Sequence, residues 1–434
     1  MVLESKATEF EKIYQCLEQS QPDAARATCD DVLKKQPENP EALHLKGVIL
    51  YQQHKLEAAL PYLEKASKFA PENPHYLNTL GLLQRHMRQR EAALTTFQIA
   101  LTHKPDFGQA HANMALVYLD KGDKQKALSC FTKALPLLPN NTDVLTNYAH
   151  TLRDSGQIEQ AADIYHQVLA LDPDNERFLL NAGAIEMARQ CEREACQIYQ
   201  KVLQQNPRQP TARHMMAGLK GETTPTAPDA YVADLFDAYA HDFDHHLAAL
   251  AYQVPAMLGA RIPAVMAPKA KQGTWQVLDL GCGTGACGLQ MTDYKAHMVG
   301  VDLSRKMLKK ASQHGVYDDL VAMNLCRYLA QTQTMFDVIM AADVFVYIGD
   351  LNEVFGAVAR CAHQGALFAF STESATPQEG DYILRATGRY AQSSGYIKDL
   401  AYDYKFSVLL AKEIVVRKDE RGNIPGHLYI LQKN

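Results

Sequence analysis

Residues 275–288 read WQVLDLGCGTGACG, and this stretch decides the fold of the second half of the chain. Residues 275–280 form a short apolar run of the kind that predicts a buried strand. Gly281, Gly283 and Gly285 follow at once, and glycine adopts the positive φ angles that a tight turn requires. The stretch therefore predicts a strand, a glycine-rich turn and the start of a helix.

Strands and helices alternate beyond this turn. A helix is predicted from Ser304, where a serine cap precedes apolar residues at helical spacing, and another at residues 351–361. Apolar runs predict further strands at residues 297–304, 320–325, 336–344 and 366–374. This alternation is typical of a doubly wound parallel sheet. The last segments, 407–419 and 426–434, predict an antiparallel hairpin that closes the sheet.

The glycine-rich turn fits two kinds of site. Three of its glycines satisfy the G-x-G-x-x-G pattern of dinucleotide-binding folds. However, Asp279 lies inside the strand, and the order D-L-G-C-G-T-G resembles motif I of the Rossmann-like (class I) methyltransferases that use S-adenosylmethionine (SAM). Asp302, at the end of the second strand and 21 residues after Gly281, fits the same family. The resemblance implies a SAM-dependent methyltransferase domain.

That resemblance also assigns roles in a cofactor site. The backbone of the turn would approach the methionine part of SAM, with Asp279 organising the turn and reaching the ammonium group through water. Asp302 would accept hydrogen bonds from both ribose hydroxyls. The residues of the turn that the resemblance assigns to the cofactor are Gly281, Cys282, Gly283 and Gly285.

Four more positions extend the expected site. Leu303 would flank the adenine, and Asn324 falls where the family usually has an aspartate that binds the adenine amino group. An asparagine there can still accept through its amide oxygen. Asp343 would face the sulfonium or the methyl acceptor from the end of its strand, and Tyr347 would line the same pocket.

Methyl transfer is an in-line displacement, so positioning can provide much of the catalysis and a base is optional. The candidate bases are His241, His246, Asp343 and Glu373. Tyr239 and Phe243, four apart on one helical face, would cover the cofactor, with helix packing as the alternative. Arg389, beside Tyr390, would clamp an anionic group.

A period of 34 residues organises the first half of the chain. Small residues and, four positions later, large apolar residues recur with the same period, which predicts pairs of amphipathic helices that stack as a solenoid. The pattern resembles tetratricopeptide repeats, with a degenerate first unit and a closing helix at residues 210–220. The prolines that mark the period are Pro37, Pro71, Pro105, Pro139, Pro173 and Pro207.

Asn113, Asn147 and Asn181 share one register in three successive first helices. In this repeat family first helices line the concave surface, and an amide both donates and accepts hydrogen bonds, so the three would bind the backbone of an extended peptide. The alternative is that they satisfy neighbouring backbone groups.

The expected organisation is a repeat array at residues 1–220, a linker at 221–228, lid helices at 229–273 and the methyltransferase domain at 274–434. The combination resembles predicted bacterial methyltransferases that carry tetratricopeptide repeats. A cluster at Asp242, Asp244, His245 and His246 invites a metal interpretation, but adjacent histidines on a helix point to different sides, and we expect no metal site.

The formal net charge of −5 gives no electrostatic reason to expect a nucleic-acid partner. No apolar stretch is long enough to suggest a membrane span, so we expect a cytoplasmic protein without a membrane partner. Three functions stay open. The first is a SAM-dependent methyltransferase acting on a protein or peptide that the repeats recruit. The others are a small-molecule methyltransferase whose repeats dock a partner, and a scaffold that binds SAM without turning it over.

Overall fold

The computed structural model describes residues 2–240, 243–244, 247, 250, 252–266, 274–294, 296–419 and 422–434. The chain divides into two compact units, Met1–Ile185 and Glu186–Asn434. None of the helices in the described ranges is both long and apolar enough to cross a membrane.

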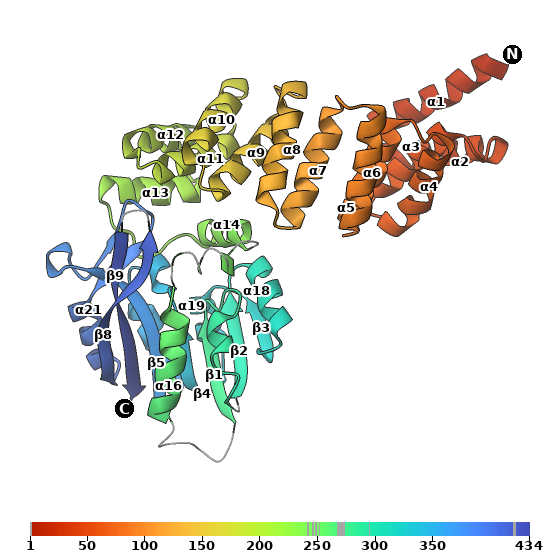
Figure 1. The fold of residues 1–434 in the computed structure, drawn as a ribbon. Coiled ribbons are helices and arrows are strands. Elements are labelled where there is room, and N and C mark those ends of the chain that lie inside the picture. Colours follow the sequence, from red (N-terminus) through yellow and green to blue (C-terminus); the bar gives the residue numbers. More distant parts are fainter. Residues whose placement is uncertain are drawn as a thin grey trace. The chain divides into compact units, whose positions relative to one another are not determined.

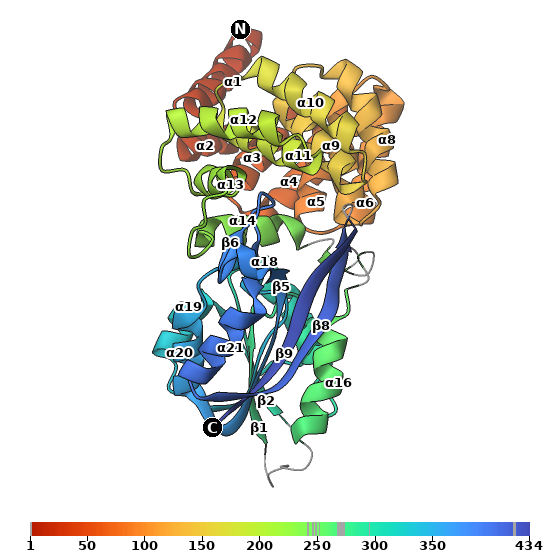
Figure 2. The same ribbon diagram turned by 90° about the vertical axis from the view of Figure 1, so that its left-hand side faces the viewer.

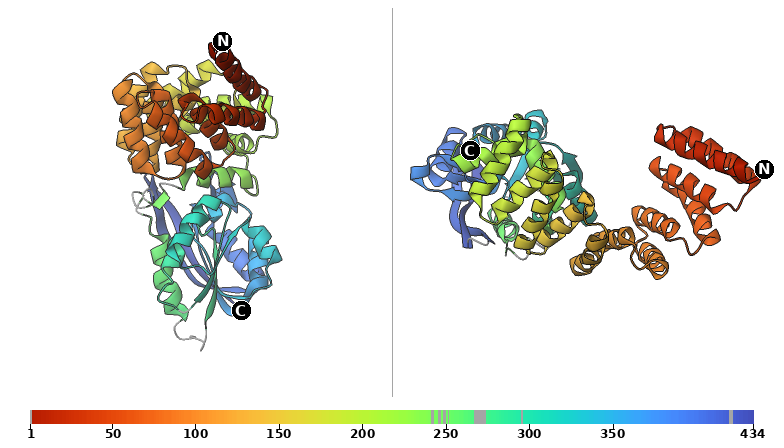
Figure 3. Two further views of the ribbon diagram at one scale, coloured as in Figure 1. Left: turned by 90° about the vertical axis from the view of Figure 1, so that its right-hand side faces the viewer. Right: turned by 90° about the horizontal axis from the view of Figure 1, so that it is seen from above.

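The first unit is a series of helical pairs, drawn from red to yellow-green in Figures 1 and 3. In the five pairs between Val2 and Leu171 the two helices of a pair contact each other, and each of these pairs contacts the next. The helices are α1 (Val2–Glu18), α2 (Pro22–Lys35), α3 (Pro40–Gln52), α4 (Leu56–Phe69), α5 (Pro74–His86), α6 (Arg90–His103), α7 (Gly108–Asp120), α8 (Lys124–Ala134), α9 (Thr142–Asp154), α10 (Ile158–Leu171) and α11 (Glu176–Ala188).

The sequence period explains these pairs, and the predicted solenoid is confirmed. Small residues let paired helices approach: a Cβ atom added at Gly47 would lie 2.5 Å from Leu63, and one at Gly81 would lie 2.7 Å from Phe97. The periodic prolines follow the ends of the second helices, and asparagines such as Asn73 cap the next first helix by accepting from its backbone N–H groups.

The second unit holds a nine-stranded sheet in which β3, β2, β1, β4 and β5 run parallel, in that order. The strand β9 pairs with β5 in the antiparallel sense, and β8 pairs with β9, which confirms the predicted hairpin. The strands are β1 (Trp275–Leu280), β2 (Ala296–Asp302), β3 (Asp319–Ala322), β4 (Phe336–Ala341), β5 (Ala362–Ala375), β6 (Tyr382–Leu384), β7 (Tyr390–Ser393), β8 (Phe406–Asp419) and β9 (Gly422–Lys433).

Helices cover both faces of this sheet (Figure 2). One core layer joins the sheet to α16 and α17 through residues such as Leu258 and Cys287, and the other joins it to α19, α20 and α21 through residues such as Phe355 and Leu400. The helices of the second unit are α12 (Glu192–Gln205), α13 (Pro210–Lys220), α14 (Asp229–Tyr239), α16 (Val254–Met266), α17 (Ala286–Leu289), α18 (Arg305–Ala311), α19 (Leu325–Gln331), α20 (Asn352–Cys361) and α21 (Ser394–Asp403).

The division between the compact units differs from the domain boundary that the sequence predicted at residue 220. It falls 35 residues earlier, so that both α12 and α13, the predicted closing helix, belong to the second unit. His214 of α13 donates to the carbonyl of Gly388 (2.9 Å), and a Cβ atom added at Gly218 would lie 2.6 Å from the carbonyl oxygen of Arg385.

The predicted linker, residues 221–228, is extended, but it lies within the second unit and contacts other parts of it. Thr226 forms a β-bridge with Ile348, and the backbone N–H of Gly349 donates to the carbonyl of Pro225 (2.8 Å). The hydroxyl of Thr224 lies 2.6 Å from that of Tyr390. Residues 221–228 therefore form part of the edge of the second unit.

Candidate functional site

A cavity of about 380 Å³ lies at the carboxyl ends of β1, β2 and β4, and α14 supplies part of its wall. Parallel strands direct ligands to this edge of a doubly wound sheet. The glycine-rich turn contributes Gly281, Cys282 and Gly283 to the lining, while Asp302 and Asp343 come from the ends of β2 and β4.

The turn requires glycine for reasons of backbone and space. Gly281, Gly283 and Gly285 have φ angles of 64°, 54° and 99°. A Cβ atom at Gly281 would lie 2.5 Å from Val344, and the N–H of Gly281 donates to the carbonyl of Val301 (2.7 Å). The turn is thus held against β2 at the rim of the cavity.

Asp302 joins the turn to the next helix. Its Oδ2 accepts from the backbone N–H of Gly283 (2.9 Å) and its Oδ1 from that of Ser304 (2.8 Å). Burial raises the pKa of Asp302, although these N–H groups oppose the shift. A carboxylate has about four lone-pair sites, so each oxygen can accept one further hydrogen bond on the cavity side.

Asp279 is placed differently from the sequence expectation. It is buried behind the turn, does not line the cavity and accepts a hydrogen bond from the hydroxyl of Tyr317 (2.7 Å). Burial raises the pKa of Asp279 to about 7; the bond from Tyr317 opposes this shift and the charge of Asp302 adds to it. Asp279 is therefore held by Tyr317 outside the cavity lining, and its role toward the turn and the cofactor stays a prediction.

Tyr317 was missed by sequence reasoning. Cβ atoms added at Gly285, Gly288 and Gly300 would all lie within 3.1 Å of its ring or hydroxyl. The ring thus occupies space that side chains at these glycines would need, and its hydroxyl fixes Asp279. The glycine pattern signals a close neighbour, but it does not say which residue fills the space.

Asn324 caps α19 instead of presenting its amide oxygen to the cavity. That oxygen accepts from the N–H groups of Cys326 (2.8 Å) and Arg327 (3.2 Å), and the amide nitrogen donates to Asp229 (2.7 Å). Asn324, Asp229 and Leu303 all line the cavity. Asp229, at the start of α14, thus places a carboxylate near the position where the family usually has one.

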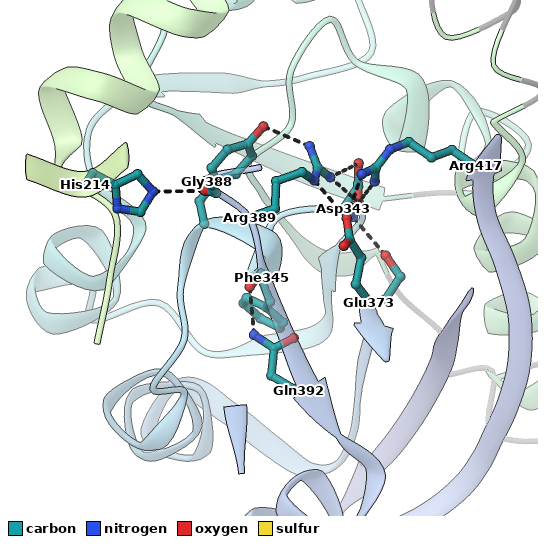
Figure 4. A network of polar contacts seen from close by, with 10 residues as sticks. His214, Asp343, Phe345, Glu373, Gly388, Arg389, Gln392 and Arg417 are labelled. Carbon is teal, nitrogen blue, oxygen red and sulfur yellow. Dashed lines mark hydrogen bonds and ion pairs between the residues drawn. The ribbon is translucent and has the colours of Figure 1, made fainter. Parts of the chain in front are cut away.

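Asp343, Glu373, Arg389 and Arg417 form an ion-pair cluster, shown in Figure 4. Arg389 donates to both oxygens of Asp343 (3.1 and 3.0 Å) and to Glu373 (2.8 Å). Arg417, on β8, donates to Glu373 (2.7 Å). The four side chains are 6% to 19% exposed, so these charges are held largely out of water.

The cluster changes the chemistry expected of its members. Burial would raise the pKa of Glu373, but the guanidiniums of Arg389 and Arg417 outweigh it and hold that pKa below its ordinary value. Such a carboxylate is a weak base. Asp343 is held by the same two arginines, has a φ of 57° and donates its N–H to the hydroxyl of Ser371 (2.9 Å). Arg389, expected to clamp a ligand, is engaged by these acids.

Aromatic residues form a further part of the cavity wall. Tyr239 and Phe243 both line it, and Phe236 makes edge-to-face contacts with Phe243 and Tyr347. Tyr347 also lies under the guanidinium of Arg389, 5.3 Å from ring centre to carbon. The candidate bases His241 and His246 lie outside the described residues, as do Asp242 and His245.

The asparagine ladder lies in the first unit. Asn113 is buried and donates to Asn78 (2.9 Å) in the preceding first helix, whereas Asn147 and Asn181 are half-buried. Asn113 therefore has a side-chain partner, whereas the alternative interpretation expected backbone partners. Its role and those of the other two in peptide binding stay a prediction.

Models of known families match both halves of the chain. A methyltransferase domain model matches residues 271–408. The tetratricopeptide region of cytochrome c-type biogenesis protein H matches residues 82–213, and the N-terminal tetratricopeptide region of Psidin matches residues 9–114.

The curated relatives match about a quarter to a third of the chain. The ubiquinone biosynthesis O-methyltransferase of Hahella chejuensis is 31% identical over 126 residues, which are 26% of this chain and 52% of that protein. An 18S rRNA (guanine-N(7))-methyltransferase of Arabidopsis thaliana is 26% identical over 151 residues, or 32% and 51%. The chain thus spans about half the length of these relatives.

Solved structures of repeat proteins match at low identity. The chain is 19% identical to PilF of Pseudomonas aeruginosa, with a TM-score of 0.44 over 49% of this chain and 97% of that one. The family matches agree with the fold, which has helical pairs in the first half and a sheet covered by helices in the second. The chain therefore joins an array of tetratricopeptide repeats to a methyltransferase domain of the SAM-dependent class.

Proposed function

We propose that the protein is a SAM-dependent methyltransferase whose acceptor is a protein or peptide brought to it by the repeats. The observation that carries the proposal is the cavity at the strand ends, where the glycine-rich turn meets the carboxylate of Asp302. When bound, SAM would supply an electrophilic methyl group, and the residues of this chain would bind and orient the two reactants.

The residues present fit SAM. The positive φ angles of the turn leave its backbone uncovered by side chains, and a Cβ atom at Gly283 would meet nothing closer than 3.7 Å. Asp302 has an unused acceptor position on each oxygen, which suits the two adjacent hydroxyls of a ribose. Gly281, Gly283 and Asp302 would therefore hold the cofactor.

Asp229 completes the adenine end in this proposal. The amide oxygen of Asn324 is already bonded to the two N–H groups that it caps, whereas Asp229 has spare acceptor capacity after bonding to Asn324. The adenine amino group would thus donate to Asp229. Leu303 would pack beside the ring, because it lines the same part of the cavity.

The reacting end requires orientation more than proton transfer. Tyr347 and Arg389 line it together with Asp343, and the aromatic rings of α14 and its neighbours exclude water. Placing the acceptor in line with the breaking bond converts a bimolecular reaction into an effectively unimolecular one. In this proposal Asp343 and Tyr347 orient the acceptor.

One feature supports a macromolecular acceptor. The first unit offers a row of stacked first helices, and the half-buried amides of Asn147 and Asn181 could bind a peptide backbone there.

A small-molecule acceptor is the second candidate. It is favoured by the likeness to ubiquinone biosynthesis O-methyltransferases, which covers 26% to 27% of this chain. In that case the repeats would dock a partner without presenting the substrate.

One experiment separates the two candidates. The full chain is incubated with methyl-labelled SAM and a cell lysate, and protein-bound label is separated from small-molecule label. Protein-bound label supports the recruited acceptor, whereas label confined to small molecules supports the second candidate. A chain that binds SAM but transfers no label would contradict both.

Variants of the repeats test recruitment in the same assay. Replacing Asn113, Asn147 and Asn181 by alanine should reduce protein labelling without changing SAM affinity. A matched control replaces three exposed amides on second helices and should label normally: Gln98, Gln125 and Gln160 to alanine. Equal labelling by both triple variants would remove the asparagines from the proposal.

A further inference from the structure

Two hydrogen-bond donors beside the ion-pair cluster have no acceptor among the described residues. Nη1 of Arg417 is buried without a hydrogen-bond partner, and its ion-pair contact with Oδ1 of Asp343, at 3.6 Å, is too long for a hydrogen bond. The hydroxyl of Tyr347 accepts from Arg389 (3.1 Å), but its own proton is donated to no described group. Both side chains line the cavity. Because unpaired buried donors are costly, they indicate a ligand that supplies oxygen.

The carboxylates near this end of the cavity are paired with arginines. Both oxygens of Asp343 accept from Arg389, whereas Glu373, whose Oε1 accepts from Arg389 and Arg417, does not line the cavity. An ammonium or hydroxyl acceptor must lose a proton before or during methyl transfer, and these paired carboxylates are poorly suited to take it. The described residues at this end thus favour a nucleophile that needs no base.

The charges nearest the acceptor are consistent with this conclusion. The two guanidiniums and two carboxylates of the cluster sum to zero, so an anionic acceptor would lie beside a neutral cluster and next to the positive sulfonium of SAM.

We infer that the methyl acceptor is a carboxylate, a conclusion that rests on the proposed methyltransferase function. One carboxylate oxygen receives hydrogen bonds from Nη1 of Arg417 and the hydroxyl of Tyr347. The other attacks the methyl carbon, so that an oxygen–carbon bond forms as the sulfur–carbon bond breaks. The electron pair of the broken bond stays on sulfur, the products are a methyl ester and S-adenosylhomocysteine, and no proton is released.

Stability to base distinguishes a methyl ester from other products. Full-length protein labels a lysate with methyl-labelled SAM, and the dialysed protein fraction and the small-molecule filtrate are each treated with mild alkali. We expect the label to be released as volatile methanol, from the protein fraction for a side-chain or terminal carboxylate and from the filtrate for a small acid. Label that survives alkali, as on nitrogen or an ether oxygen, would overturn the inference.

Blocking the acceptor gives a second readout. Carbodiimide and an amine convert the carboxylates of the extract to amides before the enzyme is added. Labelling should then be lost, and persistent labelling would contradict a carboxylate acceptor. A chain that fails to bind SAM in calorimetry, or binds it and transfers no label, contradicts the proposed function itself, so the two failures are distinguishable.

Variants test the assigned donors. Tyr347→Phe keeps the ring, and Arg417→Met keeps much of the side-chain volume; each should lower transfer about ten-fold or more without changing SAM affinity. Lys418→Met removes a positive charge from the adjacent exposed position and is the matched control. If Arg417→Met does not fold, Tyr347→Phe carries the test. Wild-type transfer by the folded variants would overturn the assignment.

Discussion

Replacing Asp302 by alanine should weaken SAM binding by at least about ten-fold. In the proposed complex each oxygen of Asp302 accepts one backbone N–H and one ribose hydroxyl. A hydrogen bond to a charged group contributes roughly 1.5–3 kcal/mol, so the loss of one such bond corresponds to about 10- to 150-fold in affinity. Loss of the second bond would add to this effect.

Asp302→Asn is a sharper form of the same test. Its amide nitrogen would have to face the N–H of Gly283 or that of Ser304, so two donors would oppose each other. We therefore expect the asparagine variant to bind SAM more weakly than wild type, despite the similar shape of the two side chains.

Asp337→Ala serves as the matched control. Asp337 is a buried carboxylate that accepts from the N–H of Gln276 (3.1 Å), but it lies at the amino end of β4 and does not line the cavity. Isothermal titration calorimetry gives the affinities, and thermal unfolding verifies that each variant folds. Asp302→Ala with wild-type SAM affinity would refute the assigned site.

Three further predictions concern the buried acid, the repeats and the adenine end. Because the pKa of Asp279 is raised to about 7 in the folded chain, its contribution to stability is present below its ordinary pKa of 3.8 and is lost as the pH rises through 7. Asp279→Asn should therefore be more stable than wild type by a few kcal/mol at pH 8 in urea unfolding, and by less at pH 5; a pH-independent difference would contradict this. Gly81→Ala should destabilise the repeats by about 1–3 kcal/mol, since its Cβ would lie 2.7 Å from Phe97, and Phe97→Leu should restore part of the loss. An unchanged unfolding midpoint for Gly81→Ala would contradict the close packing of Gly81 against Phe97. Asp229→Asn should lower SAM affinity several-fold in calorimetry by weakening the contact with the adenine amino group, and unchanged affinity would argue against that contact.

Local patterns allowed much of the fold to be predicted. The periodic prolines and small residues act within one helical pair, as Gly47 and Leu63 do, so the sequence carries their spacing directly. The glycine-rich turn likewise depends on neighbouring residues and on β2. Both features need only short-range geometry and the alternation of apolar runs.

The ion-pair cluster could not be predicted because its members come from distant strands. Arg417 reaches Glu373 only because β9 pairs with β5 and β8 pairs with β9. The sequence placed Asp343 and Arg389 near the site, but it gave no sign that they neutralise each other. The binding of the predicted linker also depends on tertiary contacts, such as that of Thr226 with Ile348.

Calorimetric titration of the wild-type chain with SAM, and separately with NADH, tests the central claim most directly. The glycine-rich turn alone would suit either cofactor, whereas the order D-L-G-C-G-T-G and the methyltransferase domain match at residues 271–408 favour SAM. We predict saturable binding of one SAM per chain and none of NADH. Binding of NADH without SAM would contradict the account.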